Sequence, residues 1–317
     1  MSAVAVCKYY KHCINGKAVA GAQMTQLVNS PKRFLVLGGS GKTGRRVIER
    51  LRRRGEEVCG ISRTTTPAFD WHDSTHSWQQ LLNGFDSVYV TYQPDLAIVR
   101  AADDIARLVV AARQAGVSHM VLLSGRGEKG AEDAEQIVAG SGLHYHILRA
   151  SWFYQNFSEG FIHAMIKAGE VALPCGDTPE PFIDADDIAA AAVRCFTDPD
   201  IAAGLYEITG PQLLTFKHCI GQIGTITGKP LRFVNLSVEA MVDVFTSAGF
   251  DHDMVWLMRH LFSEVLDGRN SNTTGTLEKL LGRAPVPFSE YASRAFAASS
   301  AEATTSEHSY IAEGAGQ

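Results

Sequence analysis

Residues 34–46, with the sequence FLVLGGSGKTGRR, decide the fold of this chain. An apolar run typical of a buried strand leads into glycines at positions 38, 41 and 44, and a helical pattern begins directly after them. Glycines let the backbone of such a turn approach a pyrophosphate, whose charge meets the free N–H groups at the start of the helix. The turn predicts a dinucleotide site; the alternative is a tight structural turn that binds nothing. The residues expected to contact the cofactor here are Gly38, Gly39, Ser40, Gly41, Lys42, Thr43 and Gly44.

The same stretch contains Gly41-Lys42-Thr43, which also resembles the end of a phosphate-binding P-loop. A P-loop requires another glycine five positions before Gly41, whereas this chain has Val36 there, inside the predicted strand. The spacing therefore disfavours a nucleoside triphosphatase.

Short aliphatic runs alternate with helical patterns along the first half of the chain. Strands are predicted at 34–37, 58–62, 87–91, 119–123 and 144–148, and helices at about 43–54, 96–115 and 132–139. This alternation is typical of a parallel sheet with crossover helices. We predict an α/β fold whose Rossmann-like doubly wound parallel sheet occupies residues 32–150.

The pattern changes beyond Arg149. Helical segments near 156–168, 186–196, 215–227, 238–248 and 254–266 alternate with only two brief strand candidates, at 205–209 and 231–234. We expect residues 151–298 to form a smaller, mostly helical substrate-binding lobe that is interleaved with the sheet. We also expect residues 1–31 to be a loosely ordered N-terminal extension and the polar residues 299–317 to be a disordered tail.

The composition excludes several classes of protein. The chain has 317 residues, of which 45% are hydrophobic and 20% charged, as in an ordinary globular protein. A net charge of -5 offers no general attraction for nucleic acid or membranes, and the longest apolar stretch, 188–193, is far shorter than the roughly 18 residues of a membrane span. The six cysteines form no CxxC pair, which favours a reducing cytoplasm. We expect a cytoplasmic monomer or homodimer whose partner is a small-molecule substrate, with no nucleic acid and no membrane.

The end of the second predicted strand indicates which dinucleotide binds. NAD-binding chains usually place an acidic residue about 20 positions beyond the glycine turn, whereas an arginine there accommodates the 2′-phosphate of NADP. Residues 61–66 read ISRTTT, without a carboxylate. Arg63, between hydroxyl side chains, therefore favours NADP(H) over NAD(H), and a solvated loop charge is the alternative.

Several motifs resemble the NmrA-like, atypical branch of the short-chain dehydrogenase/reductase family. They are LVLGGSGKTG at 35–44, SGR at 124–126, SGLHYHILRASWFYQNF at 141–157, PFIDADDIA at 181–189 and LEKLLGRAPVPFSEYA at 277–292. Within that family, FDW at 69–71, LRASWFYQNFS at 148–158 and GPQLLTF at 210–216 are similar to the ergot-alkaloid clavine (agroclavine and festuclavine) dehydrogenases. The resemblance implies a Rossmann-like domain, a small C-terminal substrate lobe and NADPH. For the clavine enzymes it also implies hydride delivery to the C=N of an iminium.

One feature departs from most short-chain dehydrogenases, which use Tyr-x-x-x-Lys to transfer a proton to a carbonyl oxygen. No tyrosine in this chain has a lysine four positions later. The departure fits reduction of a cationic C=N, which already carries the charge that an acid would otherwise create. It fits equally a quinone reductase and a non-catalytic NADP(H) sensor of the same family. We predict an NADPH-dependent oxidoreductase acting on a C=N or quinone-like acceptor, with a sensor that binds a protein partner as the alternative.

The remaining site candidates follow from the rule that open α/β sheets bind ligands outside the carboxyl ends of their strands. Ser124, where the family's catalytic serine aligns, and Tyr154 are the candidate catalytic residues, although a serine that closes a strand is often only a cap. Further cofactor contacts are expected from Asp70, Thr91, Tyr92 and Ser124. Substrate contacts are expected from Tyr92, Trp152, Phe153 and Asn156, whose aromatic members would serve equally well in packing between the lobes.

Three other groups of residues favour structure over chemistry. His144 and His146 would share a strand face, and His72 and His76 have metal-like spacing, but no familiar set of cysteines or carboxylates accompanies either pair, and we predict no metal site. The aspartates at 184, 186 and 187 precede an alanine-rich helix, where acids cap free N–H groups. Met254, Leu257, Met258, Leu261 and Val265 have the helical spacing of a core stripe.

Overall fold

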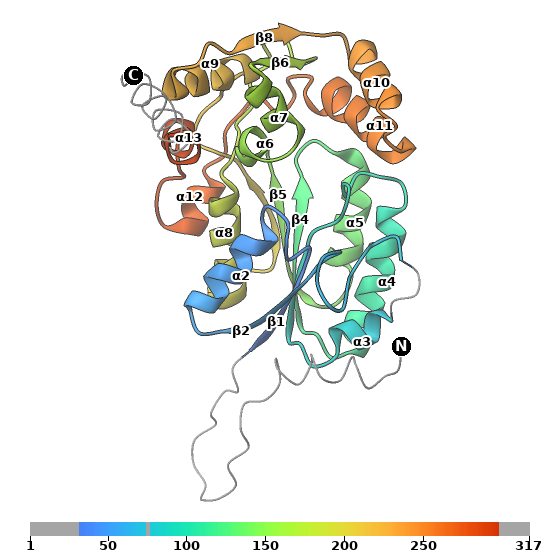
Figure 1. Cartoon of the computed structure of the whole chain (residues 1–317). Helices are drawn as coiled ribbons and strands as arrows, with labels where there is room; N and C mark the ends of the chain where they lie inside the picture. Colours follow the sequence, from blue (N-terminus) through green and yellow to red (C-terminus); the bar gives the residue numbers. More distant parts are fainter. Residues whose placement is uncertain (1–31, 74–76, 298–317) are drawn as a thin grey trace, which may run out of the picture. The chain divides into compact units, whose positions relative to one another are not determined.

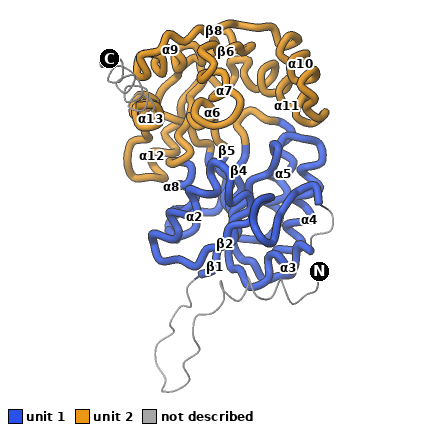
Figure 2. Tube along the Cα trace, viewed as in Figure 1, with its two compact units in different colours: residues 1–124, 129–148, 188–206 blue, residues 125–128, 149–187, 207–317 orange. Residues whose placement is uncertain are grey.

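The structure, a computed structural model, describes residues 32–73 and 77–297 (Figure 1). The chain forms two compact units (Figure 2). Unit 1 comprises the residues up to 124 together with 129–148 and 188–206, and unit 2 comprises 125–128, 149–187 and the residues from 207 onwards. The predicted boundary after residue 150 lies close to the crossing at 148/149, and residues 188–206 then return to unit 1. The predicted extension 1–31, His76 and the predicted tail 299–317 lie outside the described residues.

A sheet of six strands runs in the order β2-β1-β3-β4-β5-β7 (Figure 1). The strands are β1 (Arg33–Leu37), β2 (Glu57–Ile61), β3 (Ser87–Val90), β4 (His119–Gly125), β5 (His144–Ala150) and β7 (Gly204–Ile208). β2 and β3 both pair with β1 in parallel, and β4 pairs in parallel with β3. The chain therefore leaves β1 first to one side of the sheet and later to the other, which makes the β1/β3 border the switch point of the predicted doubly wound fold.

Helices cover both faces of the sheet in unit 1. They are α2 (Gly44–Arg53), α3 (Trp78–Leu82), α4 (Ala101–Gln114), α5 (Lys129–Ala139) and the greater part of α8 (Ala185–Thr197). Figure 1 shows α2 and α8 on one face and α3, α4 and α5 on the other. In α2, Val47, Ile48 and Leu51 recur at helical spacing and are buried, while arginines occupy much of the remaining surface. The sheet is thus covered by amphipathic helices, as the alternation of the sequence predicts.

Unit 2 combines helices with a small parallel sheet of β6 (Glu170–Leu173) and β8 (Arg232–Asn235). Its helices are α6 (Gln155–Ser158), α7 (Phe161–Ala168), α9 (Phe216–Thr227), α10 (Val238–Ser247), α11 (His252–His260), the π-helical turn η1 (Leu261–Val265), α12 (Thr276–Leu281) and α13 (Phe288–Phe296). Its core is aromatic: Phe157, Phe182, Phe216 and Phe288 are fully buried. Within the described part of the chain, no helix is both long enough and apolar enough to cross a membrane.

The predicted helices differ from the observed ones where local geometry interrupts the pattern. Gly160, with a φ of 92°, separates α6 from α7 within the predicted range 156–168. The predicted helix 254–266 is α11 followed by the π-helical turn, although its core stripe is confirmed because Leu257, Met258 and Val265 are buried. The predicted helix 96–115 begins only at residue 101, since the carboxylate of Asp95 accepts from the N–H of residue 97 at 2.9 Å and holds a turn there. The strand β6 and helices α3, α12 and α13 are additional and short.

The aspartates before α8 have structural roles, as predicted. The buried carboxylate of Asp184 accepts from the N–H of Asp186 at 2.9 Å and from Arg294 Nη2 at 2.7 Å. The carboxylate of Asp187 accepts from the N–H of Val286 at 2.7 Å. These bonds cap the start of the helix and connect it to the C-terminal segment of unit 2, which confirms the structural interpretation of this cluster.

Gly44 tests how closely the turn after β1 is packed. A Cβ at Gly44 would lie 2.2 Å from the carbonyl oxygen of Gly38, a backbone atom that cannot move aside freely. We expect Gly44→Ala to lower the free energy of unfolding by about 1–3 kcal/mol, the usual cost of overpacking, as measured by denaturant titration. The matched control is Gly221→Ala in α9, where a Cβ meets nothing within 4 Å. That change should raise stability by roughly 0.5–1 kcal/mol, because alanine is the better helix former. Equal losses in both variants would contradict the packing argument.

Candidate nucleotide and substrate sites

The glycine turn is held at the switch point of the sheet by the residue that follows β3. Thr91 Oγ1 donates a hydrogen bond to the carbonyl of Leu37 at 3.1 Å. Gly38 has a φ of +76°, a conformation that favours glycine, and a Cβ there would lie 2.2 Å from Thr91 Oγ1. Thr91 therefore lies against the turn, in the place where the sequence predicts a cofactor contact.

The start of α2 is suited to an anion. Thr43 precedes the helix without a side-chain cap, and the first turn of α2 contains no acidic residue. The N–H groups at a helix start carry a partial positive charge, so an uncapped and acid-free start favours a phosphate group. Ser40 is exposed, Gly39, Thr43 and Gly44 are buried, and Gly41 and Lys42 are half-buried. This donor set fits the pyrophosphate of a dinucleotide, and these residues would hold it.

A hollow of about 540 Å³ opens beside the turn in unit 1. Part of its wall is formed by Gly39, Ser40, Gly60 and Thr65. The rest comes from one face of α2, where the lining side chains are Arg45, Ile48, Glu49, Arg52 and Arg53. Since Glu49 forms an ion pair with Arg53, the hollow has an excess of positive charge.

Arg45 and Arg52 are not among the site residues predicted from sequence. The sequence feature that could have indicated them is their spacing of seven residues. This spacing places both on the same face of the helix that follows the glycine turn. Both line the hollow near the end of β2, which is where the 2′-phosphate of NADP lies in folds of this kind.

Arg63 spans the carboxyl end of β1. It follows β2, is exposed, and donates from Nη2 to Oε1 of Gln93, which follows β3, at 3.1 Å. Because β1 lies between β2 and β3 in the sheet, this bond joins the segments that follow the two strands flanking β1. Hydroxyls order the surrounding loop, since Thr65 Oγ1 accepts from the N–H of Ser62 at 2.8 Å. The predicted contact of Arg63 with a 2′-phosphate stays a prediction, and its position at the switch point supports it.

Asp70 and Tyr92 have structural partners in unit 1. Tyr92 is 6% exposed, its hydroxyl donates to the buried carboxylate of Asp104, and its ring centroid lies 4.5 Å from that of Trp71. The Trp71 indole in turn donates to the carbonyl of Thr91 at 3.0 Å. The carboxylate of Asp70, half-buried, accepts from the N–H of residue 72 at 3.0 Å. For Tyr92 the structure thus shows packing within unit 1, and the predicted ligand contacts of both residues remain untested.

Ser124 is buried at the end of β4 and has a charged partner. Its hydroxyl donates to Oε1 of Glu135 in α5 at 2.6 Å, and both side chains are 4% exposed. The proton of Ser124 is therefore directed at a carboxylate, which makes this serine a poor proton donor, although its lone pairs can still accept a hydrogen bond. A positioning role at the cofactor edge remains our prediction for it.

Tyr154 lies in the core of unit 2, which argues against the predicted catalytic role. Its side chain is fully buried, its hydroxyl donates to the carbonyl of Val286 at 3.2 Å, and its ring stacks on Tyr291 at 5.1 Å. Burial raises the pKa of Tyr154 far above its usual range. A phenol that is enclosed by protein and bonded to a backbone carbonyl is suited to packing, and the catalytic role of Tyr154 stays a prediction.

The predicted substrate contacts are partly exposed residues of unit 2. Trp152 is half-buried, with its ring centroid 5.3 Å from those of both Phe216 and Phe262. Phe153 forms a β-bridge with Ile183, and Asn156 belongs to α6; both are half-buried. Unlike Tyr154, these three residues retain exposed surface with which to contact a ligand.

Glu180 is a buried titratable group that no sequence pattern predicts. This carboxyl is 2% exposed in unit 2, and burial raises its pKa to about 7, although a backbone hydrogen bond from Trp152 and the charge of Arg126 act in the opposite direction. A group with such a pKa exchanges protons near neutral pH. No pattern in the sequence marks Glu180, because its burial depends on contacts far along the chain.

The chain is similar in sequence to one protein family and to several individual proteins. The NAD(P)H-binding family matches residues 38–199. Prestalk A differentiation protein A of Dictyostelium discoideum is 25% identical over 89% of this chain and 98% of its own length. An NAD(P)H azoreductase of Xenophilus azovorans and agroclavine dehydrogenase of Claviceps fusiformis are each 27% identical over 82% of this chain and 96% of their own lengths.

Solved structures share the fold at lower identity. Triphenylmethane reductase of Citrobacter sp., in complex with NADP(H), superposes with a TM-score of 0.68 at 20% identity, over 83% of this chain and 99% of that one. NmrA, a negative transcriptional regulator, superposes with a TM-score of 0.63 at 15% identity, over 87% of this chain and 98% of that one. These likenesses confirm the Rossmann-like fold.

Arg63 and Arg45 can be tested by their effect on the choice between two nucleotides. Hydrogen bonds to charged groups contribute about 1.5–3 kcal/mol each, so Arg63→Ala should weaken NADPH binding by roughly tenfold to a hundredfold and leave NADH unchanged. Arg45→Ala should act in the same direction. The measurement is the Kd of each nucleotide at one ionic strength, because salt screens exposed charges. Arg232→Ala in unit 2, at a side chain that is 71% exposed, is the control. Equal losses for NADPH and NADH would assign Arg63 to loop stability, and tighter NADH binding by the unchanged protein would overturn the cofactor preference.

Glu180 predicts a particular pH dependence of stability. Its pKa in the folded state, about 7, lies above the ordinary value of 4.5. Below pH 4.5 the carboxyl is therefore protonated in both the folded and the unfolded state, and its burial does not lower the free energy of unfolding. Between these two values the unfolded chain ionises first and stability falls as pH rises, by up to about 3 kcal/mol at 1.36 kcal/mol per pKa unit. Glu180→Gln should therefore raise the Tm more at pH 8 than at pH 5. The exposed Glu278→Gln is the control, and identical pH profiles for both variants would refute this assignment.

Proposed function

This chain belongs to the NAD(P)H-binding family, with NmrA-like relatives as its motifs predict, and we propose that it is an NADPH-dependent reductase of a C=N or quinone-like acceptor. The observation that carries the preference for NADPH is the basic hollow beside the glycine turn, lined by Arg45 and Arg52. A phosphate monoester carries close to two negative charges near pH 7, and guanidinium groups bind it with paired hydrogen bonds.

The nature of the acceptor is inferred from the proton donors. Of the two candidates from sequence, Ser124 directs its proton at Glu135 and Tyr154 directs its proton at a backbone carbonyl. A neutral ketone needs an acid to protonate its developing alkoxide. An iminium needs none, because the C=N electron pair moves onto nitrogen as the carbon receives hydride and cancels the existing charge. A quinone delocalises the charge that it gains and can take its proton from water. These acceptors therefore suit the residues at hand better than a ketone.

The residues of this chain would bind and orient, while NADPH, when bound, supplies the hydride. The backbone N–H groups of the glycine turn and of the α2 start would hold the pyrophosphate, and Arg63 the 2′-phosphate. Ser124, fixed by Glu135, would present its hydroxyl oxygen as a hydrogen-bond acceptor at the end of β4. Its lone pairs can orient a neighbouring N–H or cationic group. The names of two relatives, an azoreductase and agroclavine dehydrogenase, are consistent with conjugated nitrogen-containing acceptors.

The test is NADPH oxidation with a panel of cyclic iminium ions, quinones, azo dyes and neutral ketones. We expect turnover of at least one of the first three classes and none of the ketones. Ser124→Ala should reduce the rate only mildly, far less than the roughly 10²-fold loss expected for removal of a general acid. Ser118→Ala, at the other end of β4, is the matched control. Turnover of none, together with tight NADPH binding, would replace this proposal by the nucleotide sensor, which the NmrA likeness favours as the second candidate.

A further inference from the structure

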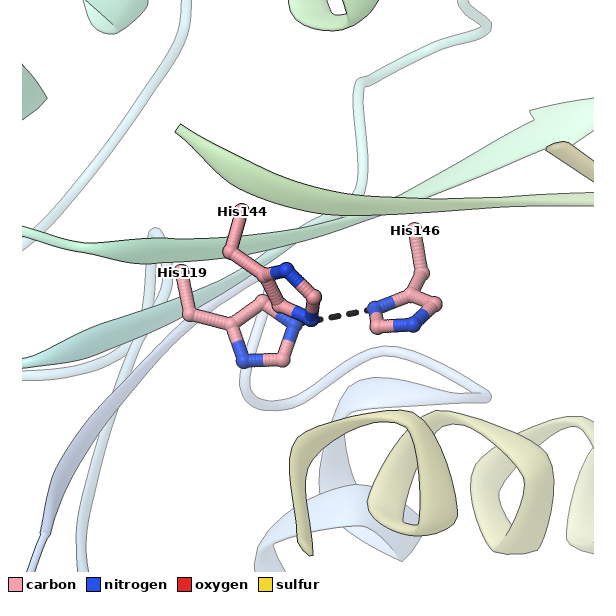
Figure 3. A group of neighbouring side chains, drawn as sticks. All are labelled: His119, His144 and His146. Atoms are coloured by element: carbon pink, nitrogen blue, oxygen red, sulfur yellow. Dashed lines mark hydrogen bonds between the residues drawn. The ribbon is translucent and has the colours of Figure 1, made fainter. Parts of the chain in front are cut away.

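Three histidines converge at the edge of the sheet where β4 and β5 begin. His119 is the first residue of β4, and His144 and His146 are the first and third residues of β5. Figure 3 shows the three rings turned toward one another, and one ring nitrogen from each lies within 4.8 Å of the others. Ser124 and the glycine turn belong to the carboxyl ends of the strands, so this cluster lies at the opposite edge of the sheet from the nucleotide-binding turn. The proposed function leaves it unused.

We propose that His119, His144 and His146 bind one divalent transition-metal ion of the zinc type, with a fourth position open to solvent. Imidazole nitrogens suit zinc, copper and nickel, whereas magnesium and calcium prefer oxygen ligands. Among the described residues the cluster contains no carboxylate or thiolate, so the donor set consists of three imidazole nitrogens. Three protein ligands with one free position is a familiar arrangement for zinc.

The spacing of the nitrogens is close to that of a tetrahedral site. With Zn–N bonds of about 2.0–2.1 Å, two nitrogens on a tetrahedral ion lie about 3.3 Å apart. Nε2 of His119 and Nδ1 of His146 are 2.9 Å apart, and all three ligand nitrogens lie within 4.8 Å of one another. The required distance falls between these values, so rotation of the rings alone can close the site. His144 is exposed and has room to make that rotation.

The hydrogen bonds of His146 select the tautomer that a metal needs. Its Nε2 lies 3.2 Å from the carbonyl oxygen of Ile201, which can only accept, so Nε2 carries the proton and Nδ1 presents a lone pair to the cluster. Ligand histidines characteristically donate their second ring N–H to a backbone carbonyl in this way. Nδ1 of His146 then accepts from Nε2 of His119, and on metal binding the His119 proton moves to Nδ1 of the same ring.

One positive charge near the cluster would act on an ion bound there. Lys32, which is exposed, is the nearby positive charge that opposes an ion. Replacing it should strengthen binding if the ion sits among these rings.

This proposal departs from the sequence-based expectation of no metal site. Of this cluster, the sequence pattern indicates only His144 and His146, because their spacing of two places both on one strand face. The third ligand, His119, precedes them by 25 residues in the sequence. It joins them only because β4 and β5 are neighbours in the sheet.

The test uses the full chain after metal removal, equilibrated by dialysis with Zn²⁺ and analysed for bound metal. We expect one tightly bound ion per chain and a higher Tm, because an ion that binds only the folded state stabilises it. His144→Ala should weaken binding by at least about 100-fold, since loss of even an outer-sphere partner costs roughly 10- to 100-fold. His218→Ala, at an exposed histidine of α9, is the matched control and should leave binding unchanged. Unchanged binding in His144→Ala, or no stoichiometric ion in the unchanged protein, would overturn the proposal.

Two further measurements identify the ligands and separate this proposal from the proposed function. The Co²⁺-loaded protein should show the ligand-field bands of nitrogen and oxygen ligands without a thiolate charge-transfer band. A thiolate band that persists in His144→Ala would locate the ion elsewhere, for example at Cys7, His12 and Cys13, and contradict the proposal. Lys32→Glu should tighten Zn²⁺ binding several-fold, and a loss of affinity would contradict it. NADPH binding should be the same in all these variants, which also shows that they fold.

Discussion

The close approach between the carbonyl of Gly38 and the Cα of Gly44 is the contact on which the rest of unit 1 depends. A Cβ on Gly44 would lie 2.2 Å from that oxygen, so the chain can turn from β1 into α2 this tightly only without a side chain. The hydroxyl of Thr91 then joins the end of β3 to the end of β1. This tight turn places the start of α2 at the switch point of the sheet. The nucleotide-binding features follow from these few contacts.

The charges at the start of α2 suit an anion. Arginines at 45 and 46 occupy its first turn, which contains no acidic residue, and a positive charge there opposes the helix dipole at a typical cost of 0.3–1 kcal/mol. Glu49 is paired with Arg53. A bound phosphate reverses the sign of this interaction at the helix start. The helix therefore gives up some intrinsic stability for a site that becomes favourable when the nucleotide binds.

The sequence predicted the fold because the signals for the fold are local. A strand, a glycine turn, a helix and a second strand fit within about thirty residues, and the amphipathic pattern of the crossover helices repeats that information. The contacts of the site side chains, in contrast, are made with residues distant in the sequence. Ser124 meets Glu135 from the following helix, and Tyr154 meets Val286, which lies 132 residues further along the chain. From sequence both appear only as polar residues at strand ends, which is why their hydrogen-bond partners could not be predicted.

Buried polar groups depend on tertiary contacts that their sequence patterns do not show. A strand that is covered on both faces ordinarily carries aliphatic residues, which pack without any demand for hydrogen bonds. His146 is fully buried and His119 is 7% exposed, so each ring nitrogen must find a partner or cost free energy. In the absence of metal these needs are met by a hydrogen-bonded chain from His119 through His146 to the carbonyl of Ile201. Aliphatic side chains would pack there without such a chain, and packing alone does not account for three imidazoles facing one another. A bound metal ion, which uses the lone pairs of the rings, accounts for this arrangement.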